Sequence, residues 1–498
     1  MSTGQTAAAA EEPAPSSILI IGSGVFGLTT AYELARRPRY ASTTITVLDR
    51  SPVPGPSQDA ASVDSSRIIR ADYADPAYAR LAAEAQTEWR KTEHPSDLGA
   101  EGRYSQSGLC LVADPTPTAA AAAAAPSSSS SSSPPLQRTV DTNAQAKRKA
   151  KKTSLEYVRE SYDNVVSLAG PDGDKIIREL STPAAIKDFL GTPIAPGTWG
   201  YINPLAGWAD AGAAMSYLAA KVQALGRVTF VSGTATRLNY GPDRRTVTGA
   251  TLDDGRVLSA DLVIVAAGAW TGRLVDLSGQ AIATGQAVGY IDITPSELEV
   301  LRKMPVTLNF STGLFMIPPA GLQLKVARHA FGYLNPTPVP HPSPSAPSSA
   351  RSTISLPATH LTDPRLKFPK EGEAALREAV RTIVPIPAIH DRPFSQTRLC
   401  WYTDTQSGDF LVCHHPEAKN LFVATGGSGH GFKFLPVLGR EIVNVLEGRG
   451  DVVFTDKWRW RETKTKTDVT DLYEHIMTED GSRGGIPGLL LKQEQAKL

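Results

Sequence analysis

The chain has little cysteine: Cys110, Cys400 and Cys413 are the three in 498 residues. Three cysteines are too few for a disulfide scaffold, and their spacing matches no zinc motif, so we predict no metal site. Charge of one sign is also lacking, because the net charge of +1 gives no general attraction to nucleic acid or anionic membranes. No apolar run reaches the roughly 18 residues that span a bilayer, and the acidic start MSTGQTAAAAEEPAP is unlike a signal peptide. We therefore expect neither nucleic acid nor a membrane as a partner.

What the chain does have is enough apolar material for two sizeable cores, at 41% hydrophobic residues. Three stretches contain too few large apolar residues to contribute to such a core. Residues 1–15 are expected to be a disordered tail. An alanine- and serine-rich insert at 115–135 and a proline- and serine-rich one at 336–347 are expected to be mobile surface loops.

A glycine-rich turn near the N-terminus gives the first functional signal. Residues 18–21 predict a buried strand, residues 28–36 predict a helix, and a second strand at 44–48 ends at Asp49. Between the first strand and the helix lies the pattern G-x-G-x-x-G, formed by Gly22, Gly24 and Gly27. Glycines in this context admit the pyrophosphate of a dinucleotide, and an acid about 20 residues on binds its ribose. We predict a dinucleotide site here.

A second glycine-rich turn lies near the other end of the chain. The apolar strand at 421–425 is followed by GGSG, which ends at Gly429, then by Gly431 and Lys433, and a helical pattern begins at residue 435. Free backbone N–H groups at such a turn suit an anionic group, although a plain strand-to-helix turn has the same pattern. A third element, the strand at 260–266 with its small-residue turn, would let the backbone pass close beneath a cofactor.

The simplest architecture is α/β, with an FAD-binding Rossmann-like domain and a second, mixed-sheet substrate domain. The first domain is expected from residues 16–90, 200–275 and 396–455. The second is expected from residues 91–199 and 276–395. Residues 456–498 are expected to form a C-terminal tail.

These motifs resemble a known family. GSGVFG, SRIIR (66–70), GWADAG (207–212), VAAGAW, LKVARH (324–329), CWYT and GSGHGFKF occur in the order found in flavin-dependent amine oxidases. The type concerned is monomeric sarcosine oxidase and L-pipecolate (saccharopine) oxidase, within the D-amino-acid-oxidase-like group. The resemblance spans nearly the whole chain. It implies FAD rather than NAD, an amino-acid substrate, O₂ as the second substrate and a monomeric enzyme.

The resemblance also implies roles for single residues. Cys400 matches the cysteine that binds the flavin covalently, and Lys325 matches the lysine that promotes reaction with oxygen. Arg70 and Lys433 match the pair that holds the substrate carboxylate. Arg67 matches an arginine that lies against the flavin, and Tyr402 and His329 match polar residues of the active site.

Each residue also has an ordinary structural alternative. Arg70 follows two apolar residues, which favours an inward direction over a surface ion pair. Lys325 lies between Leu324 and Val326, where a buried lysine needs a reason, although a snorkelling lysine gives the same pattern. Cys400 without its CWYT context would be a core thiol, and His329 fits a core histidine equally well.

Three departures from the family pattern concern the substrate. Val63 stands where bacterial sarcosine oxidases carry a histidine, and Phe315-Met316 correspond loosely to the aromatic residues before the oxygen-activating lysine. Both alter the pocket wall or the surroundings of the flavin. The SRIIR segment differs from fungal fructosyl-amine oxidases, which disfavours a glycated amino acid.

The function expected from the sequence is oxidation of a carboxylate-bearing secondary amine (sarcosine, L-pipecolate or saccharopine type) to an imine, with H₂O₂ as the second product. The alternatives are a fructosyl-amino-acid oxidase and a flavin dehydrogenase that uses another electron acceptor. An alternative from a different class is a non-catalytic flavin-fold binding protein.

The last three residues, Ala496-Lys497-Leu498, are a variant of the Ser-Lys-Leu address that the peroxisomal import receptor reads. We predict a peroxisomal enzyme, since catalase there removes H₂O₂. A fluorescent protein fused to the N-terminus should give punctate fluorescence that co-localises with a peroxisomal marker. A version that lacks the last three residues should be diffuse, and diffuse fluorescence from both would contradict the prediction.

Overall fold

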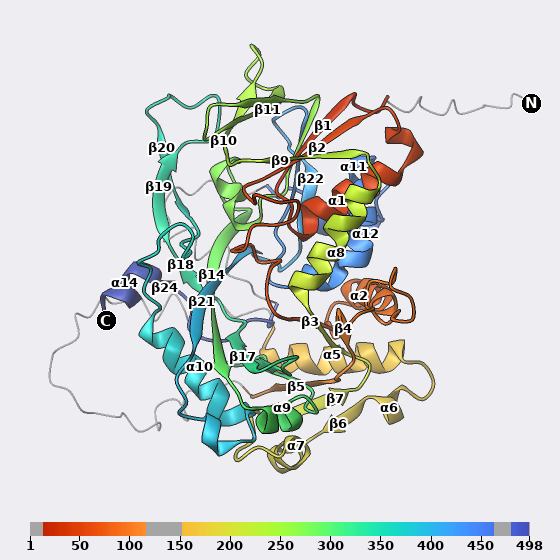
Figure 1. The fold of residues 1–498 in the computed structure, drawn as a ribbon, viewed down its shortest axis with the longest axis vertical. Coiled ribbons are helices and arrows are strands. Elements are labelled where there is room, and N and C mark those ends of the chain that lie inside the picture. The colour runs from red at the N-terminus through yellow and green to blue at the C-terminus, as the bar shows by residue number, and fades with distance from the viewer. Residues whose placement is uncertain (1–12, 116–151, 463–479, 498) are drawn as a thin grey trace, which may run out of the picture.

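The computed structural model describes residues 13–115, 152–462 and 480–497 (Figure 1). Residues 1–12 of the expected tail and residues 116–135 of the first insert lie outside the described residues. Among the described helices, none combines the length and apolar character that a bilayer-spanning helix needs. The chain forms a nucleotide-binding sheet with its helices at one end and a larger mixed sheet at the other (Figure 1).

The nucleotide-binding sheet has six strands in the order β22-β23-β13-β1-β2-β9. All neighbours are parallel except the edge strand β22. Their bounds are β1 (Ser17–Ile21), β2 (Thr44–Asp49), β9 (Val228–Ser232), β13 (Leu262–Val265), β22 (Leu411–His414) and β23 (Leu421–Thr425). Parallel strands need cover on both faces, which explains their apolar runs. The predicted strands at 18–21, 44–48 and 421–425 are confirmed.

Side-chain alternation along β1 gives each face of this sheet its own core. Ile18 and Ile20 pack in the cluster that includes α1 (Val25–Arg36), α8 (Ala211–Ala224) and α11 (Leu435–Leu446). Leu19 and Ile21 pack on the opposite side. There the cover is a three-stranded sheet of β10 (Ala235–Tyr240), β11 (Val247–Leu252) and β12 (Val257–Ser259).

The second sheet has ten strands and forms the substrate domain. Its main path runs β24-β18-β14-β17-β16-β15-β5-β7-β6, and β21 pairs with β14 off this path. The bounds are β5 (Leu109–Ala113), β6 (Arg178–Leu180), β7 (Trp199–Asn203), β14 (Ala281–Asp292), β15 (Val306–Asn309), β16 (Leu314–Ile317), β17 (Gln323–Arg328), β18 (Tyr333–Leu334), β21 (Gln396–Thr405) and β24 (Leu489–Leu490). The predicted α/β fold, with a Rossmann-like domain and a mixed-sheet domain, is confirmed.

Helix α10 (Lys370–Ile383) covers one face of the ten-stranded sheet, and this explains the direction of Lys325. Leu324 and Val326 on β17 pack in the same cluster as Leu376 and Val380 of α10. Alternation along the strand therefore places Lys325 on the opposite face, which is the face that meets the nucleotide-binding domain.

Three details depart from the sequence-based organisation. Strand β21, which carries Cys400, was grouped with the nucleotide-binding segments but pairs with β14 in the ten-stranded sheet. Residues 336–347 are not only loop, because β19 (Pro336–Pro340) pairs with β20 (Arg351–Ser355). The C-terminal residues are not simply a tail either: α12 (Val452–Trp458) buries Trp458, β24 pairs with β18, and α14 (Leu491–Ala496) buries Leu491. The β19–β20 hairpin was not expected because its sequence is rich in proline and serine, which is typical of loops. The order of the C-terminal segment was not expected because it depends on pairing with a strand far away in the sequence.

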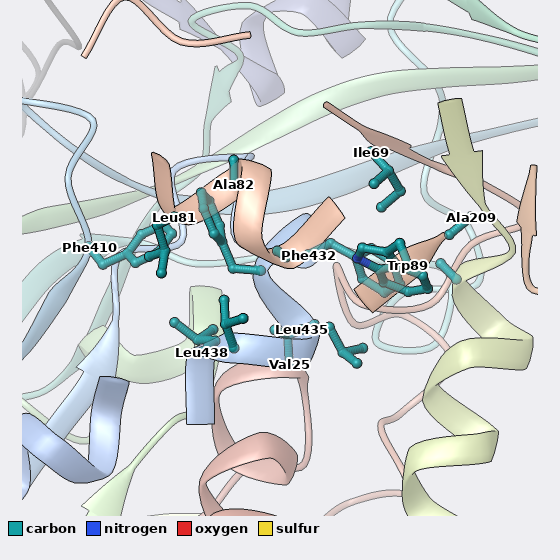
Figure 2. Close-up of a cluster of buried hydrophobic side chains, with 14 of the residues drawn as sticks. Val25, Ile69, Leu81, Ala82, Trp89, Ala209, Phe410, Phe432, Leu435 and Leu438 are labelled. Carbon is teal, nitrogen blue, oxygen red and sulfur yellow. The ribbon is translucent and has the colours of Figure 1, made fainter. Parts of the chain in front are cut away.

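The core that contains Ile18 and Ile20 extends to the small sheet of β3 (Arg67–Ile69), β8 (Gly207–Ala209) and β4 (Tyr104–Ser105). Figure 2 shows Leu81, Ala82 and Trp89 of α2 (Pro76–Trp89) beside Leu435 and Leu438 of α11. The Trp89 ring stacks on Phe432 at 5.9 Å, and its indole N–H donates to the carbonyl oxygen of Lys433 at 2.8 Å. This packing fixes the backbone beside the second glycine-rich turn.

Candidate functional site

The turn between β1 and α1 is closed so tightly that it requires glycine. Gly22 has φ +106°, and a Cβ there would lie 2.4 Å from the carbonyl oxygen of Ala266. A Cβ on Gly27 would lie 1.8 Å from the carbonyl oxygen of Gly22. Gly24 is the N-cap of α1, with no side-chain cap. The turn therefore presents backbone close to the turn that follows β13.

A long groove runs over this turn. At one end it is lined by Gly22, Gly24 and Asp49, the last residue of β2. The Asp49 carboxylate accepts hydrogen bonds from the backbone N–H groups of Ser23 at 2.8 Å and Ser51 at 2.9 Å. The hydroxyl of Ser23 is buried without a hydrogen-bond partner. Gly22 and Gly24 leave room for a pyrophosphate over the turn, and Asp49 is positioned for a ribose.

The other end of the groove is lined by Arg67, Tyr402, Gly429 and Gly431. Gly429 has φ +68°, and a Cβ there would lie 2.4 Å from the Tyr402 ring. Residues 428–430 form a turn, η4 (Phe432–Phe434) follows, and the helical pattern expected from residue 435 is confirmed as α11. The close approach to Tyr402 is the reason for glycine here.

A second, smaller cavity adjoins that end of the groove. Both cavities share Arg67, Tyr402 and Gly429 in their lining. The smaller cavity brings together most residues singled out from the sequence, since its lining includes Arg67, Arg70, Lys325, His329, Tyr402, Gly429 and Lys433. Phe315 and Ile317 of β16 form an apolar part of its wall. We call it the substrate cavity.

The carboxylate of Asp64 holds three cations beside this cavity. Its Oδ2 lies 2.7 Å from Nζ of Lys325 and 3.0 Å from Arg398, and it also pairs with Arg67. Its Oδ1 accepts from the Tyr290 hydroxyl at 2.6 Å. Burial alone would raise the pKa of Asp64, but the three cations outweigh it and hold that pKa well below its usual value. Asp64 is therefore an anion throughout the neutral range.

Lys325 is 3% exposed and also donates to the carbonyl oxygen of Ser66 at 2.7 Å. Burial lowers the pKa of Lys325, and the Asp64 carboxylate opposes that shift. The geometry, with Nζ between a carboxylate and a carbonyl oxygen, fits the ammonium form.

Cys400 lies on β21 and is 2% exposed. Its Sγ accepts a hydrogen bond from the Arg67 guanidinium at 3.3 Å. Arg398, Cys400 and Tyr402 are spaced by two along β21, so they share one face of the strand. None of the three cysteines is among the residues that line the groove or the substrate cavity. Cys400 differs from the others by its contact with Arg67, which lines both spaces, whereas burial raises the pKa of the Cys110 and Cys413 thiols.

Arg70 follows β3 and has a guanidinium nitrogen, Nη1, that is buried without a hydrogen-bond partner. The guanidinium lies 5.0 Å from the ring centre of Tyr73 and 5.2 Å from that of Phe310. The nearby Asp72 carboxylate accepts instead from Tyr201 at 2.9 Å and from Asn203 at 3.1 Å. A buried donor without a partner is rare in a folded protein and marks a place for an anionic ligand.

Lys433, in η4, is 6% exposed. Its Nζ donates to the Tyr73 hydroxyl at 2.9 Å and to the carbonyl oxygen of His430 at 3.1 Å. Burial and the Arg70 charge lower the pKa of Lys433 well below its usual value. Arg70 and Lys433 both lie about 5 Å from the centre of the Tyr73 ring.

His329 follows β17 and meets Arg483, a residue from the C-terminal segment. Nη1 of Arg483 lies 2.9 Å from Nδ1 of His329, and Nη2 lies 2.6 Å from the Asp404 carboxylate. Burial and the Arg483 charge lower the pKa of His329 well below its usual value, so the ring is neutral. Burial raises the pKa of Tyr402, which keeps its hydroxyl protonated.

Sequence reasoning missed several residues of this arrangement. Arg398 was open to prediction, because it is two residues before Cys400 on a strand. Asp64 stands in a polar stretch without a local signal for burial. Arg483 lies in the segment expected to be a tail, and Tyr73 and His430 acquire their roles only through contacts across the fold. Within the described residues, no group of His, Cys, Asp and Glu side chains could hold a metal ion.

Known proteins similar to this chain share its length. Amino acid oxidase imqH of Aspergillus flavus is 32% identical over 87% of this chain and 93% of its own. L-Saccharopine oxidase of Schizosaccharomyces pombe is 28% identical over 90% of this chain and 93% of its own. The crystal structure of a modified fructosyl peptide oxidase from Aspergillus nidulans, in complex with FSA, superimposes with a TM-score of 0.74 at 26% identity. That match covers 97% of this chain and 99% of the other.

The glycine turn, whose close contacts leave no space for a Cβ, and the acid at the end of β2 fit a bound dinucleotide, and the match to FAD enzymes extends over residues 17–445. FAD is the cofactor, and the chain is an FAD-dependent amine or amino-acid oxidase. With these matches, the chain belongs to the FAD dependent oxidoreductase family.

Proposed function

We propose that this enzyme oxidises a secondary amine that carries a carboxylate, with sarcosine, L-pipecolate and saccharopine as the substrate type, and forms an imine and H₂O₂. The observation that carries the proposal is the pair Arg70 and Lys433 in the wall of one cavity, with Nη1 of Arg70 buried and unpartnered. A substrate carboxylate would satisfy that donor and gain charge-assisted hydrogen bonds.

The residues of the cavity give each part of the substrate a place. The carboxylate binds between Arg70 and Lys433, and the apolar carbons lie against Phe315 and Ile317. The shared wall at Tyr402 and Gly429 turns the carbon next to nitrogen towards the groove. FAD in that groove supplies the acceptor for the hydride equivalent. The buried walls exclude water, which strengthens the electrostatic contacts within the cavity.

We also propose that Cys400 binds the flavin covalently. Support comes from its position on β21, two residues from Tyr402 in the groove wall, and from the Arg67 guanidinium that contacts its sulfur. Arg67 lines the groove, so its contact with Sγ places the thiol directly behind the groove wall.

Lys325 is proposed to promote the reaction with O₂. Asp64 fixes its Nζ, and its side chain lines the cavity that adjoins the groove. An ammonium held in this way stabilises negative charge that develops on oxygen, and its position needs no reorganisation when the charge appears.

A fructosyl amino acid is the second candidate substrate, because the fold superimposes on fructosyl peptide oxidases. A dehydrogenase that uses another electron acceptor has the same cavity, but it needs no cation for oxygen. A non-catalytic flavin-fold binding protein has no use for an unpartnered arginine nitrogen and a buried lysine in the wall of one cavity.

The substrate class is tested with a panel of sarcosine, L-pipecolate, L-proline, saccharopine and fructosyl-valine and a peroxide assay. We expect turnover of at least one secondary amino acid. Arg70→Ala should weaken its binding by about 1.5–3 kcal/mol, or roughly 10- to 150-fold, because the charge-assisted bonds are lost.

Two controls accompany this experiment. An amine of the same shape that lacks the carboxylate should be nearly indifferent to Arg70→Ala, and Arg159→Ala, on an exposed arginine of α5 (Ser154–Leu168), should leave both amines unchanged. Equal losses for the acidic and neutral amines would place the anchor elsewhere. Turnover of fructosyl-valine alone would favour the second candidate.

For covalent attachment, wild-type protein precipitated with trichloroacetic acid should retain its yellow chromophore, whereas Cys400→Ala should release the flavin into the supernatant. Cys110→Ala is the matched control and should retain it. Flavin that separates freely from the denatured wild-type chain would refute the assignment.

Lys325→Met should slow the reaction of reduced enzyme with O₂ by roughly 100- to 1000-fold, because it removes the charge that stabilises reduced oxygen. Anaerobic reduction by substrate should change far less. Stopped-flow measurement of the two half-reactions decides the matter, with the exposed Lys303→Met as control. Comparable losses in both half-reactions would show that Lys325 has a general structural role.

A further inference from the structure

A chain of hydrogen bonds beside the substrate cavity has a fixed direction. Nε2 of His430 lies 2.7 Å from the carbonyl oxygen of Gly408, which can only accept, so Nε2 carries the proton. Burial lowers the pKa of His430 well below its usual value, so the ring is neutral and its lone pair is on Nδ1. Nδ1 accepts from the Tyr73 hydroxyl at 2.9 Å. The Tyr73 oxygen is then free to accept from Lys433.

The direction of these hydrogen bonds determines which acceptors the hydrogens on Nζ of Lys433 bind. Nζ donates one hydrogen to Tyr73 and one to the carbonyl oxygen of His430. A neutral amine has two N–H bonds and one lone pair, so both of its hydrogens are already used. The lone pair would then occupy the remaining position on Nζ, and Lys433 is one of the residues that line the substrate cavity.

The charges around Lys433 favour this neutral form. Arg70 and Arg483 act against a further positive charge, and Asp72 is the carboxylate that favours one. Asp72 is already engaged by Tyr201 and Asn203. The other titratable neighbours are the hydroxyl of Tyr73 and the neutral rings of His430 and His329. In the described parts of the chain no carboxylate forms an ion pair with Lys433, in contrast to Lys325 and its partner Asp64.

The other titratable groups in the cavity wall are poor proton acceptors. Tyr402 is protonated, and Lys325 is paired with Asp64. Arg483 donates to the ring of His329, and its charge opposes protonation of that ring. Lys433 is the group in this wall whose lone pair is left for a ligand.

We propose that Lys433 is an unprotonated amine in the free enzyme and that it takes the proton which the substrate's ammonium group must lose before oxidation. This inference rests on the proposed function, since it presumes an amino acid in the cavity. An N–H bond of the substrate ammonium breaks, its proton forms a bond to Nζ of Lys433, and the electron pair of the broken bond stays on the substrate nitrogen. No proton enters or leaves the complex.

Both products of this transfer serve the reaction. Lys433 becomes an ammonium that pairs with the substrate carboxylate, which compensates the charge that was unfavourable beside Arg70. The substrate nitrogen gains the lone pair that assists departure of a hydride from the neighbouring carbon. The carboxylate thus supplies the negative charge that makes Lys433 a stronger base.

Proton counting separates this model from binding to a lysine that is already charged. A carboxylate without an ammonium group must draw the proton for Lys433 from solvent. Its affinity should therefore fall about tenfold per pH unit where free Lys433 is neutral. A zwitterionic amino acid brings its own proton and should bind with no such dependence.

The probe is (methylthio)acetate, which has the shape of sarcosine but a sulfur in place of the nitrogen. Binding to the holoenzyme is followed by the flavin absorbance from pH 7 to 9, and by calorimetry at pH 8 in two buffers of different ionisation enthalpy. We expect uptake of about one proton by wild type and by the exposed-lysine control Lys175→Met. Lys433→Met and Lys433→Arg should show none.

Lys433→Arg gives a second readout, because arginine keeps the charge but offers no lone pair. Anaerobic reduction by the amino acid should become base-dependent in this variant and rise about tenfold per pH unit below the pKa of the substrate amine. Wild-type reduction should be flat over the same range. If the arginine variant does not fold, the proton count of wild type against Lys433→Met decides alone.

The two hypotheses fail in different ways. Tight binding of (methylthio)acetate to wild type without proton uptake would overturn the role of Lys433 as a base and leave the carboxylate anchor intact. A holoenzyme that binds neither (methylthio)acetate nor any amino acid of the panel would overturn the proposed function itself, and with it the inference.

Discussion

The carboxylate of Asp64 determines how positive charge is held in the site. Buried cations cost free energy unless an anion lies among them, and Asp64 contacts Lys325, Arg67 and Arg398 at once. These partners belong to three different strands, β17, β3 and β21. The same ion cluster therefore positions Lys325 and joins the segment before β3 to the ten-stranded sheet. Because three cations surround one carboxylate, an excess of positive charge remains beside the groove, where it favours an anionic reduced flavin.

The two buried lysines of the cavity illustrate how surroundings separate residues of one type. Lys325 faces a carboxylate at 2.7 Å, whereas Lys433 faces a hydroxyl, a carbonyl oxygen and two arginines. The first environment fits an ammonium at neutral pH, the form proposed to act on oxygen, because Asp64 opposes the effect of burial, which lowers the pKa of Lys325 to about 8. The second fits an amine that gains its proton only when a carboxylate arrives. One cavity can in this way hold a cation for oxygen and a base for the amine.

Local patterns were sufficient to predict some parts of the fold and site. The turn at Gly22 could be predicted from the glycine pattern, because the φ and close contacts of this position admit only glycine and the residue type therefore marks the turn. The direction of Lys325 could be predicted because apolar Leu324 and Val326 flank it on the strand and face the opposite side. Arg483 could not be found in this way, because it is brought to His329 and Asp404 by pairing of the C-terminal segment with the large sheet. Pairing between distant segments depends on tertiary packing, which a local pattern does not contain.

One short turn relates the groove to the substrate cavity. Gly429 lies against Tyr402, His430 accepts from Tyr73, and Lys433 reaches the cavity, so residues 429–433 contact both spaces. On the other side of Gly429, Tyr402 and Cys400 are two residues apart on β21. The flavin attachment proposed at Cys400 and the carboxylate anchor at Lys433 are thus related through a single strand-to-turn contact. Hydride transfer requires near-contact between donor carbon and acceptor. A Cβ at position 429 would collide with the Tyr402 ring, so glycine is what allows this turn to lie against the strand that carries Cys400.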